Sequence, residues 1–258
     1  MKKFFKISNV SNHVVKVELS NGKKHNPLSL ELIKALTNSL KEVSSQENVK
    51  VLIISSAGPG FSAGHDLEEL RQNKNNKEFF QNLFNECSNL MQTIMHLSQP
   101  VIAEVCGIAA AAGCQLVASC DLAVASENAS FMTPGVNIGL FCSTPMVAVS
   151  RNISRKKIME MLLTGESMSA KDAVDYGLIN HCVPVDQLQD KTMSLANLIA
   201  SKPISTVKIG KEAFYKQVEM PISEAYNYTS EVMAKNMLEL DAHEGISAFL
   251  EKRLPEWN

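Results

Sequence analysis

The chain has 258 residues, of which 45% are hydrophobic and 20% are charged, which is enough for one large domain with a sizeable core. Its 25 Lys and Arg residues against 27 Asp and Glu residues give a net charge of −2, which argues against nucleic acid or an anionic membrane as partner. Plentiful Ile, Leu, Val and Met residues exclude a disordered chain.

The N-terminal third of the chain predicts strands and helices in alternation. Residues 1–20 contain neither an apolar stretch long enough for a signal peptide nor an arginine-rich transit-peptide pattern, so we expect a cytoplasmic protein. Alternating residues at 15–19 predict a half-buried strand, and apolar residues at 28–43 have the spacing of one helix face. A continuous apolar run at 49–55 indicates a strand buried on both faces, and a helix is predicted over 77–97.

The apolar tract at residues 100–125 has the length of a membrane span, but Glu104, Gln115, Asp121 and two glycines interrupt it. We therefore predict a strand at 101–105, a helix at 110–119 and a strand at 122–126. Strands that alternate with helices in this way predict a parallel sheet in a layered α/β fold.

The C-terminal part is almost wholly helical, with helices predicted at 186–201, 204–217, 222–240 and 242–252. We expect residues 1–195 to form the core and residues 196–258 to form a helical region, which often covers a site or another subunit.

Cysteine and histidine spacing gives no support for a metal site. The six cysteines contain no Cys-x-x-Cys pair and mostly stand in apolar surroundings, which is typical of core thiols in a reducing compartment. The six histidines are not spaced with Cys, Asp or Glu as metal ligands, so we expect no metal.

Residues 60–64 match the G-x-S-x-G pattern of a serine hydrolase, with Ser62 as the candidate nucleophile. Asp241 and His243 would complete a triad, but a pair two residues apart near the C-terminus is a weak candidate. A second interpretation is that small residues here and at 108–113 let backbone N–H groups approach a ligand. Two such groups would form an oxyanion hole for a carbonyl. A third is that small residues only permit tight packing.

Segments along nearly the whole chain resemble the enoyl-CoA hydratase/isomerase (crotonase) family. They are residues 26–29, 61–67, 107–123, 131–139, 163–170 and 244–253. The Gly-His-Asp and Ala-Ala-Gly-Cys-Gln segments are most similar to the group of enoyl-CoA hydratase domain-containing protein 3. The resemblance implies a spiral ββα core, a helical C-terminal trimerisation region, homotrimers or homohexamers, and an acyl-CoA substrate of fatty acid metabolism.

The resemblance also implies roles for particular residues. The N–H groups of Ala63 and Ala112 match the oxyanion hole, where they would stabilise enolate charge on a CoA thioester. CoA is then the carrier of the substrate, and no separate cofactor is expected. The residues implied to contact CoA are Lys23, Lys24, Asn26, Ala63, His65, Asp66, Leu67, Phe249 and Lys252, the last two often across a subunit boundary.

The chain departs from the family pattern at both catalytic glutamates. Hydratases of the family use two glutamates as base and acid, whereas this sequence has Gln115 and Gly135, and neither can move a proton. We therefore predict a thioester-polarising pocket, of lyase or isomerase type, without efficient hydration. The other candidates near the reacting carbons are His65, Asp66, Asn137 and Cys142.

Three alternatives remain open at this point. The first is an acyl-CoA decarboxylase or thioester hydrolase, because the Gly-His-Asp loop also resembles methylmalonyl-CoA decarboxylase, although the tyrosine of that branch is absent near Cys142. The second is a non-catalytic acyl-CoA binder, in which His65 and Asp66 only hold a loop. The third is the serine hydrolase.

Overall fold

Six strands form the main sheet of the structure, a computed structural model that describes residues 4–257. In spatial order they are β1 (Phe5–Asn9), β2 (Val14–Leu19), β3 (Val51–Ser56), β5 (Val101–Val105), β7 (Leu122–Ser126) and β10 (His181–Val183). β1 is antiparallel to β2, and all other neighbours are parallel. The predicted parallel sheet in an α/β fold is therefore confirmed.

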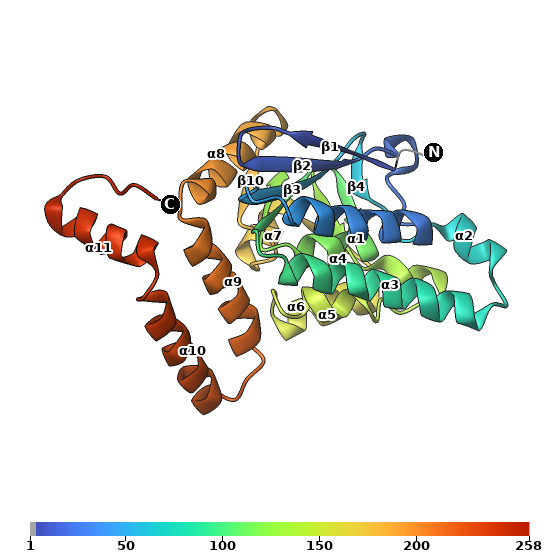
Figure 1. The fold of residues 1–258 in the computed structure, drawn as a ribbon. Helices are drawn as coiled ribbons and strands as arrows, with labels where there is room; N and C mark the ends of the chain where they lie inside the picture. The colour runs from blue at the N-terminus through green and yellow to red at the C-terminus, as the bar shows by residue number, and fades with distance from the viewer. Residues whose placement is uncertain (1–3, 258) are drawn as a thin grey trace.

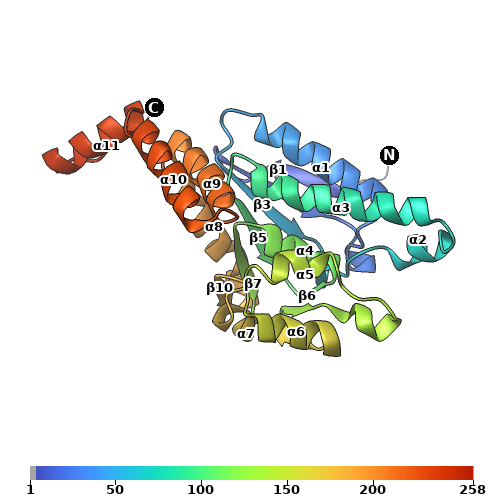
Figure 2. The same ribbon diagram turned by 90° about the horizontal axis from the view of Figure 1, so that it is seen from below.

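Both faces of this sheet are covered by helices, as Figure 2 shows. On one face, Leu52 and Ile54 join a core with α1 (Leu30–Ser44) and α3 (Lys77–His96). On the other face, Val51 and Ile53 pack with α8 (Leu188–Ala200). Because successive side chains of a strand point to opposite faces, this double cover explains the continuous apolar run at 49–55.

A second sheet consists of four three-residue strands in the order β4 (Gly60–Ser62), β6 (Ile108–Ala110), β8 (Ser130–Met132) and β9 (Ser167–Ser169). The chain passes from β3 to β4, from β5 to β6 and from β7 to β8, so three strands of the main sheet are each followed by a short one. Such short strands carry no readable alternation, which is why the sequence did not predict them.

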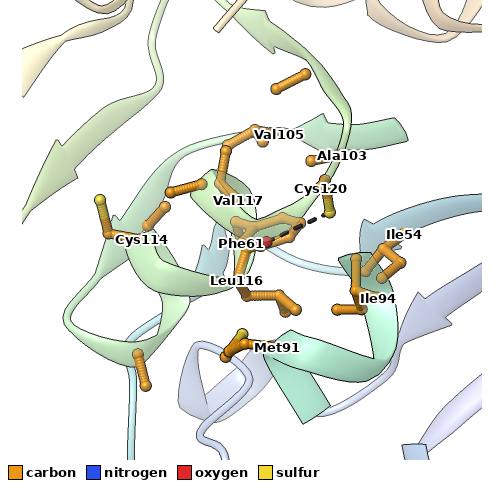
Figure 3. Close-up of a cluster of buried hydrophobic side chains, with 14 of the residues drawn as sticks. Ile54, Phe61, Met91, Ile94, Ala103, Val105, Cys114, Leu116, Val117 and Cys120 are labelled. Atoms are coloured by element: carbon orange, nitrogen blue, oxygen red, sulfur yellow. Dashed lines mark hydrogen bonds between the residues drawn. The ribbon is translucent and has the colours of Figure 1, made fainter. Parts of the chain in front are cut away.

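Helix α4 (Ala112–Ser119) connects the two sheets and is buried along its whole length. Its Leu116 and Val117 surround Phe61 of β4 together with Met91 of α3 (Figure 3). The remaining short helices are α2 (Leu67–Gln72), α5 (Pro145–Val149), α6 (Arg155–Thr164) and α7 (Ala170–Asp175), with 3₁₀ turns at Gly22–Lys24, Pro134–Ile138 and Val185–Gln187. Among residues 4–257 no helix has both the length and the apolar character to cross a membrane.

Helices α9 (Ile204–Gln217), α10 (Ile222–Asn236) and α11 (Leu240–Glu251) form an arm that leaves the body of the protein (Figure 1). The predicted boundary at 195/196 falls inside α8, whose Ala196 and Ala200 still pack on the sheet, so the arm starts later. Lys211 fastens α9 to the body, because its Nζ donates to Asp121 Oδ2 at 2.6 Å and to the carbonyl oxygens of Gln99 at 2.9 Å and Ile94 at 3.1 Å.

Candidate functional site

The loop after β4 is paired with the segment 25–28 along its backbone. The Ala63 N–H donates to His25 O at 2.8 Å, and the Leu28 N–H donates to Gly64 O at 2.8 Å. In a planar trans peptide the C=O and N–H groups point in opposite directions. The bond between Leu28 and Gly64 O therefore directs the His65 N–H away from segment 25–28, and this N–H has no hydrogen-bond partner within residues 4–257.

The first turn of α4 lies directly against this loop. Gly64 has φ +88°, and a Cβ placed on it would lie 3.0 Å from Ala110 O and 3.2 Å from Ala112 N. Ala112 is the first residue of α4, and the N–H groups of a first helical turn have no intrahelical acceptor. Two backbone donors, at His65 and Ala112, thus come from two segments that only a glycine allows to approach so closely.

The structure does not support Ala63 as one of the two predicted oxyanion donors. The Ala63 N–H is held by His25 O and is unavailable to a ligand, whereas the His65 N–H is available. The sequence pointed to the His65 side chain and did not indicate a role for its backbone N–H. Which N–H groups of the loop are bonded depends on the pairing with segment 25–28, and this tertiary contact leaves no pattern in the neighbouring residues.

The His65 side chain holds the loop as well. Its Nδ1 lies 3.3 Å from Leu28 O, and since a carbonyl oxygen only accepts, Nδ1 carries the hydrogen. Its Nε2 is buried and has no partner within the described part of the chain, and its ring contacts Phe84 edge-on. Burial lowers the pKa of His65 from 6.5, which favours the neutral ring.

Asp66 and Asn26, both predicted to bind ligand, have structural roles for their side chains. Asp66 Oδ1 accepts the N–H groups of Glu68 and Glu69 and thereby caps α2. Asn26 is fully buried, and its Nδ2 donates to Ala57 O at 3.0 Å and to Gly60 O at 2.9 Å. The prediction that Asn26 contacts CoA is therefore not supported, because no part of its side chain reaches the surface.

Gln115 and Thr133 contribute buried polar atoms near the start of α4. Gln115 is 4% exposed, and its Oε1 has no hydrogen-bond partner among residues 4–257. Thr133 Oγ1 is likewise buried and has no hydrogen-bond partner among these residues. Thr133 directly follows Met132, the last residue of β8, and Met132 O accepts the N–H of Ala111 just before α4. Buried polar atoms without partners are costly, so such atoms often indicate a place for a bound group or a water molecule.

At Gly135, the position of the second missing carboxylate, the Cys142 thiol fills the space. A Cβ on Gly135 would lie 2.9 Å from Cys142 Sγ and 3.0 Å from Leu140 O. Burial raises the pKa of Cys142, and it raises that of the nearby Cys114 to about 12. Both thiols are therefore protonated and poor nucleophiles at neutral pH.

Asn137, which was predicted to lie near the reacting carbons, is exposed. Its side chain packs on Gly165 at the end of α6, where a Cβ would come within 2.6 Å of Asn137 Nδ2. The structure thus gives Asn137 a packing contact and no link to Gln115 or Cys142.

Lys23, Lys24 and Leu67, three of the residues predicted to contact CoA, are exposed, and acidic groups lie beside Lys24. Lys24 pairs with Glu68 at 3.1 Å, and Lys23 and Leu67 face solvent. A cavity of about 420 Å³ beside them is lined by Lys24, Pro27, Asp66, Glu31, Glu68 and Glu69, among others. Its four carboxylates disfavour phosphate there, so any phosphate contact would come from the lysines outside this cavity.

The arm carries the last two predicted CoA residues and keeps them away from α4. Phe249 is 83% exposed and Lys252 ends α11, which Figures 1 and 2 both show at the far end of the arm. Within one protomer the structure does not bring these residues to the loop at His65.

The same separation contradicts the serine hydrolase. Ser62 is fully buried, and its Oγ donates to Asn26 O at 2.9 Å. Asp241 lies on α11, where its Oδ2 accepts the hydroxyl of Ser205 at 2.6 Å. No triad forms, because the supposed acid and base are on the arm while the serine is inside the body.

Comparison with known proteins agrees with these features. A family model described as enoyl-CoA hydratase/isomerase matches residues 9–258. Human enoyl-CoA hydratase domain-containing protein 3, mitochondrial, is 49% identical over 242 residues, which are 94% of this chain and 80% of that protein. A probable mitochondrial enoyl-CoA hydratase of Dictyostelium discoideum is 30% identical, covering 94% of this chain and 86% of its own.

Two crystal structures share the fold. That of a Mycobacterium smegmatis enoyl-CoA hydratase has a TM-score of 0.96 at 44% identity, covering 98% of both chains. That of human enoyl-CoA hydratase domain-containing protein 3 has a TM-score of 0.95 at 46% identity, covering 98% of this chain and 100% of its own. The predicted family and its crotonase-type fold are confirmed. The predicted cytoplasmic location is wrong by this comparison, since the vertebrate relatives are named as mitochondrial.

Proposed function

The chain belongs to the enoyl-CoA hydratase/isomerase family, and on that premise we propose that it binds an acyl-CoA and polarises the thioester carbonyl between the N–H groups of His65 and Ala112. The observation that carries this proposal is the free His65 N–H. Its neighbours Ala63 and Gly64 have their N–H groups bonded inside the protein, whereas the His65 N–H points away from segment 25–28 and has no partner within residues 4–257.

Such a site would stabilise negative charge on the thioester oxygen. When a bond at the carbon next to the carbonyl breaks, the electrons that remain form an enolate, and its charge gathers on that oxygen. Two fixed N–H donors and the positive end of the α4 dipole would face it. Because α4 is buried throughout, little water would screen these interactions.

The same site would be poor at adding water. Gln115 is an amide, position 135 has no side chain, and burial raises the pKa of the Cys142 thiol, so these three positions hold no group that titrates near neutral pH. Addition of water to a double bond needs a base and an acid. Reactions that need only a stabilised enolate, such as loss of carbon dioxide, would be slowed least by the absence of the two glutamates.

We further propose that other copies of the chain cover the arm. Helix α10 has no buried residue, and large apolar side chains along the arm are exposed: Phe214, Ile222, Tyr226, Met233, Leu238, Leu240, Phe249, Leu250 and Leu254. An apolar surface of this extent is typical of a homo-oligomer interface, here a trimer or hexamer. Phe249 and Lys252 would then reach the CoA of a neighbouring subunit.

Mass spectrometry of an acyl-CoA panel tests the proposal. Enoyl, malonyl-type and saturated thioesters are incubated with the wild type, with Gln115→Glu, and with a Gln115→Glu, Gly135→Glu, Cys142→Ala triple variant. The third change removes the sulfur that a side chain at 135 would meet. We expect slow or absent hydration by the wild type and a gain in the triple variant.

The outcomes separate the alternatives. Fast hydration of an enoyl-CoA by the wild type would refute the argument from the missing carboxylates. Release of carbon dioxide or of free CoA would assign the chemistry to a decarboxylase or a thioester hydrolase. Binding of every thioester without any product would identify an acyl-CoA binder.

A further inference from the structure

Ser62 links the loop that presents the His65 N–H to the interior of the protein. Its hydroxyl donates to Asn26 O at 2.9 Å and accepts the N–H of Gly64 at 3.2 Å. The residue is fully buried, and a Cβ on Gly113 in the first turn of α4 would lie 2.8 Å from Ser62 Cβ. The Ser62 hydroxyl therefore joins segment 25–28 to the loop after β4, and the Ser62 side chain lies against α4, the helix that carries the second donor.

The hydrogen bonds around Gly64 fix the orientation of the peptide that follows it. Gly64 O is held by the Leu28 N–H, Gly64 N–H is held by Ser62 Oγ, and Ala63 N–H is held by His25 O. Gly64 has φ +88° and no Cβ, so its own covalent structure restricts rotation about φ and ψ very little. The two bonds to Gly64 supply the missing restraint, and among residues 63–65 only the His65 N–H is left without a partner in the described part of the chain.

Asn26 provides the fixed point to which Ser62 is attached. Its side-chain N–H₂ group donates to the carbonyl oxygens of Ala57 and Gly60, on either side of the turn that leads into β4. Its own N–H donates to Asn21 O at 3.1 Å. The Asn26 carbonyl is thereby held in one place and receives the Ser62 hydroxyl.

From these contacts we infer that Ser62 is a positioning residue of the thioester site, which transmits the fixed position of Asn26 to Gly64 and keeps the His65 N–H aimed at the substrate oxygen. The inference rests on the proposed function. It also explains why a serine occupies the centre of the G-x-S-x-G segment, although its hydroxyl is buried and its hydrogen is already donated.

The test compares Ser62→Ala with Thr192→Val. Thr192 is also fully buried and donates its hydroxyl to the backbone, at Leu188 O, but it lies on α8 on the other side of the main sheet. The probe is 4-(dimethylamino)cinnamoyl-CoA, whose absorption moves to longer wavelength when its carbonyl is polarised. Free CoA serves as a second ligand that carries no thioester.

For Ser62→Ala we expect the red shift of the bound probe to be lost and probe affinity to fall about tenfold, because a slightly misplaced donor weakens the polarisation strongly. Affinity for free CoA should stay within about twofold. Thr192→Val should lose stability and keep the full red shift. A full red shift with Ser62→Ala would overturn the inference, whereas no red shift with the wild type would refute the proposed function itself.

Amide hydrogen exchange of the wild type keeps the inference testable if Ser62→Ala does not fold. Without ligand, the Ala63 and Gly64 amides should exchange slowly and the His65 amide quickly. The probe should then slow exchange at His65. Fast exchange at Gly64 in the free protein would show that the Ser62 hydroxyl does not hold this peptide, and would overturn the inference.

Discussion

Replacing Gly64 by alanine tests the close approach of the two donor segments. At φ +88° an alanine is strained by about 1–2 kcal/mol. Its Cβ would also press on Ala110 O and on the Ala111 Cβ at 3.0 Å, and forcing atoms into a packed site costs about 1–3 kcal/mol more. We therefore expect the free energy of unfolding to fall by about 2–5 kcal/mol.

Gly139 offers a matched control, because it has φ +76° but no atom within 4 Å of an added Cβ. Gly139→Ala should carry the backbone strain alone, about 1–2 kcal/mol. The assay is urea unfolding of the three proteins at one protein concentration, since assembly affects stability. The probe of thioester polarisation should lose its red shift in Gly64→Ala only. Equal losses of stability in both variants would refute the argument that Gly64 is required for close approach.

Three further predictions concern the arm, the loop histidine and assembly. Lys211→Met should cost about 3–5 kcal/mol in urea unfolding, because it leaves the largely buried Asp121 carboxylate without its cation, whereas Lys216→Met on the exposed side of the same helix should cost under about 1 kcal/mol. Equal losses in the free energy of unfolding of Lys211→Met and Lys216→Met would contradict the conclusion that Lys211 holds α9 on the body of the protein. Because burial lowers the pKa of His65, the folded protein binds fewer protons than the unfolded chain, so the stability of the wild type should fall relative to His65→Gln as the pH drops below 6.5. A constant difference in denaturation midpoints between pH 5 and 8 would contradict this. Leu250→Asp, at a side chain that is 74% exposed in one protomer, should shift the protein to monomers in light scattering, and an unchanged mass would count against the proposed interface.

Several helices and strands of the fold were predictable from the sequence. Strand β5 at Val101–Val105 and helix α9 at Ile204–Gln217 have the predicted bounds, and a proline directly before each, Pro100 and Pro203, marks where it begins. That the Ala63 N–H is bonded while the His65 N–H has no partner within residues 4–257 was not predictable. Which N–H is free depends on the pairing of residues 25–28 with the loop after β4, and the two segments are distant in the sequence.

The order of long strand, short strand and loop recurs three times along the chain, and the site draws one component from each repeat. The first repeat, β3 and β4, leads to His65, the second, β5 and β6, leads to Ala112, and the third, β7 and β8, leads to Gly135. The three positions lie two or three residues beyond neighbouring strands of the small sheet. In the proposed function the first two repeats supply the N–H donors of His65 and Ala112, whereas the positions of the two missing glutamates, Gln115 and Gly135, belong to the second and third repeats. A change of reaction type would therefore need new side chains at Gln115 and around Gly135, without any change in the two backbone N–H groups that the proposal assigns to the thioester.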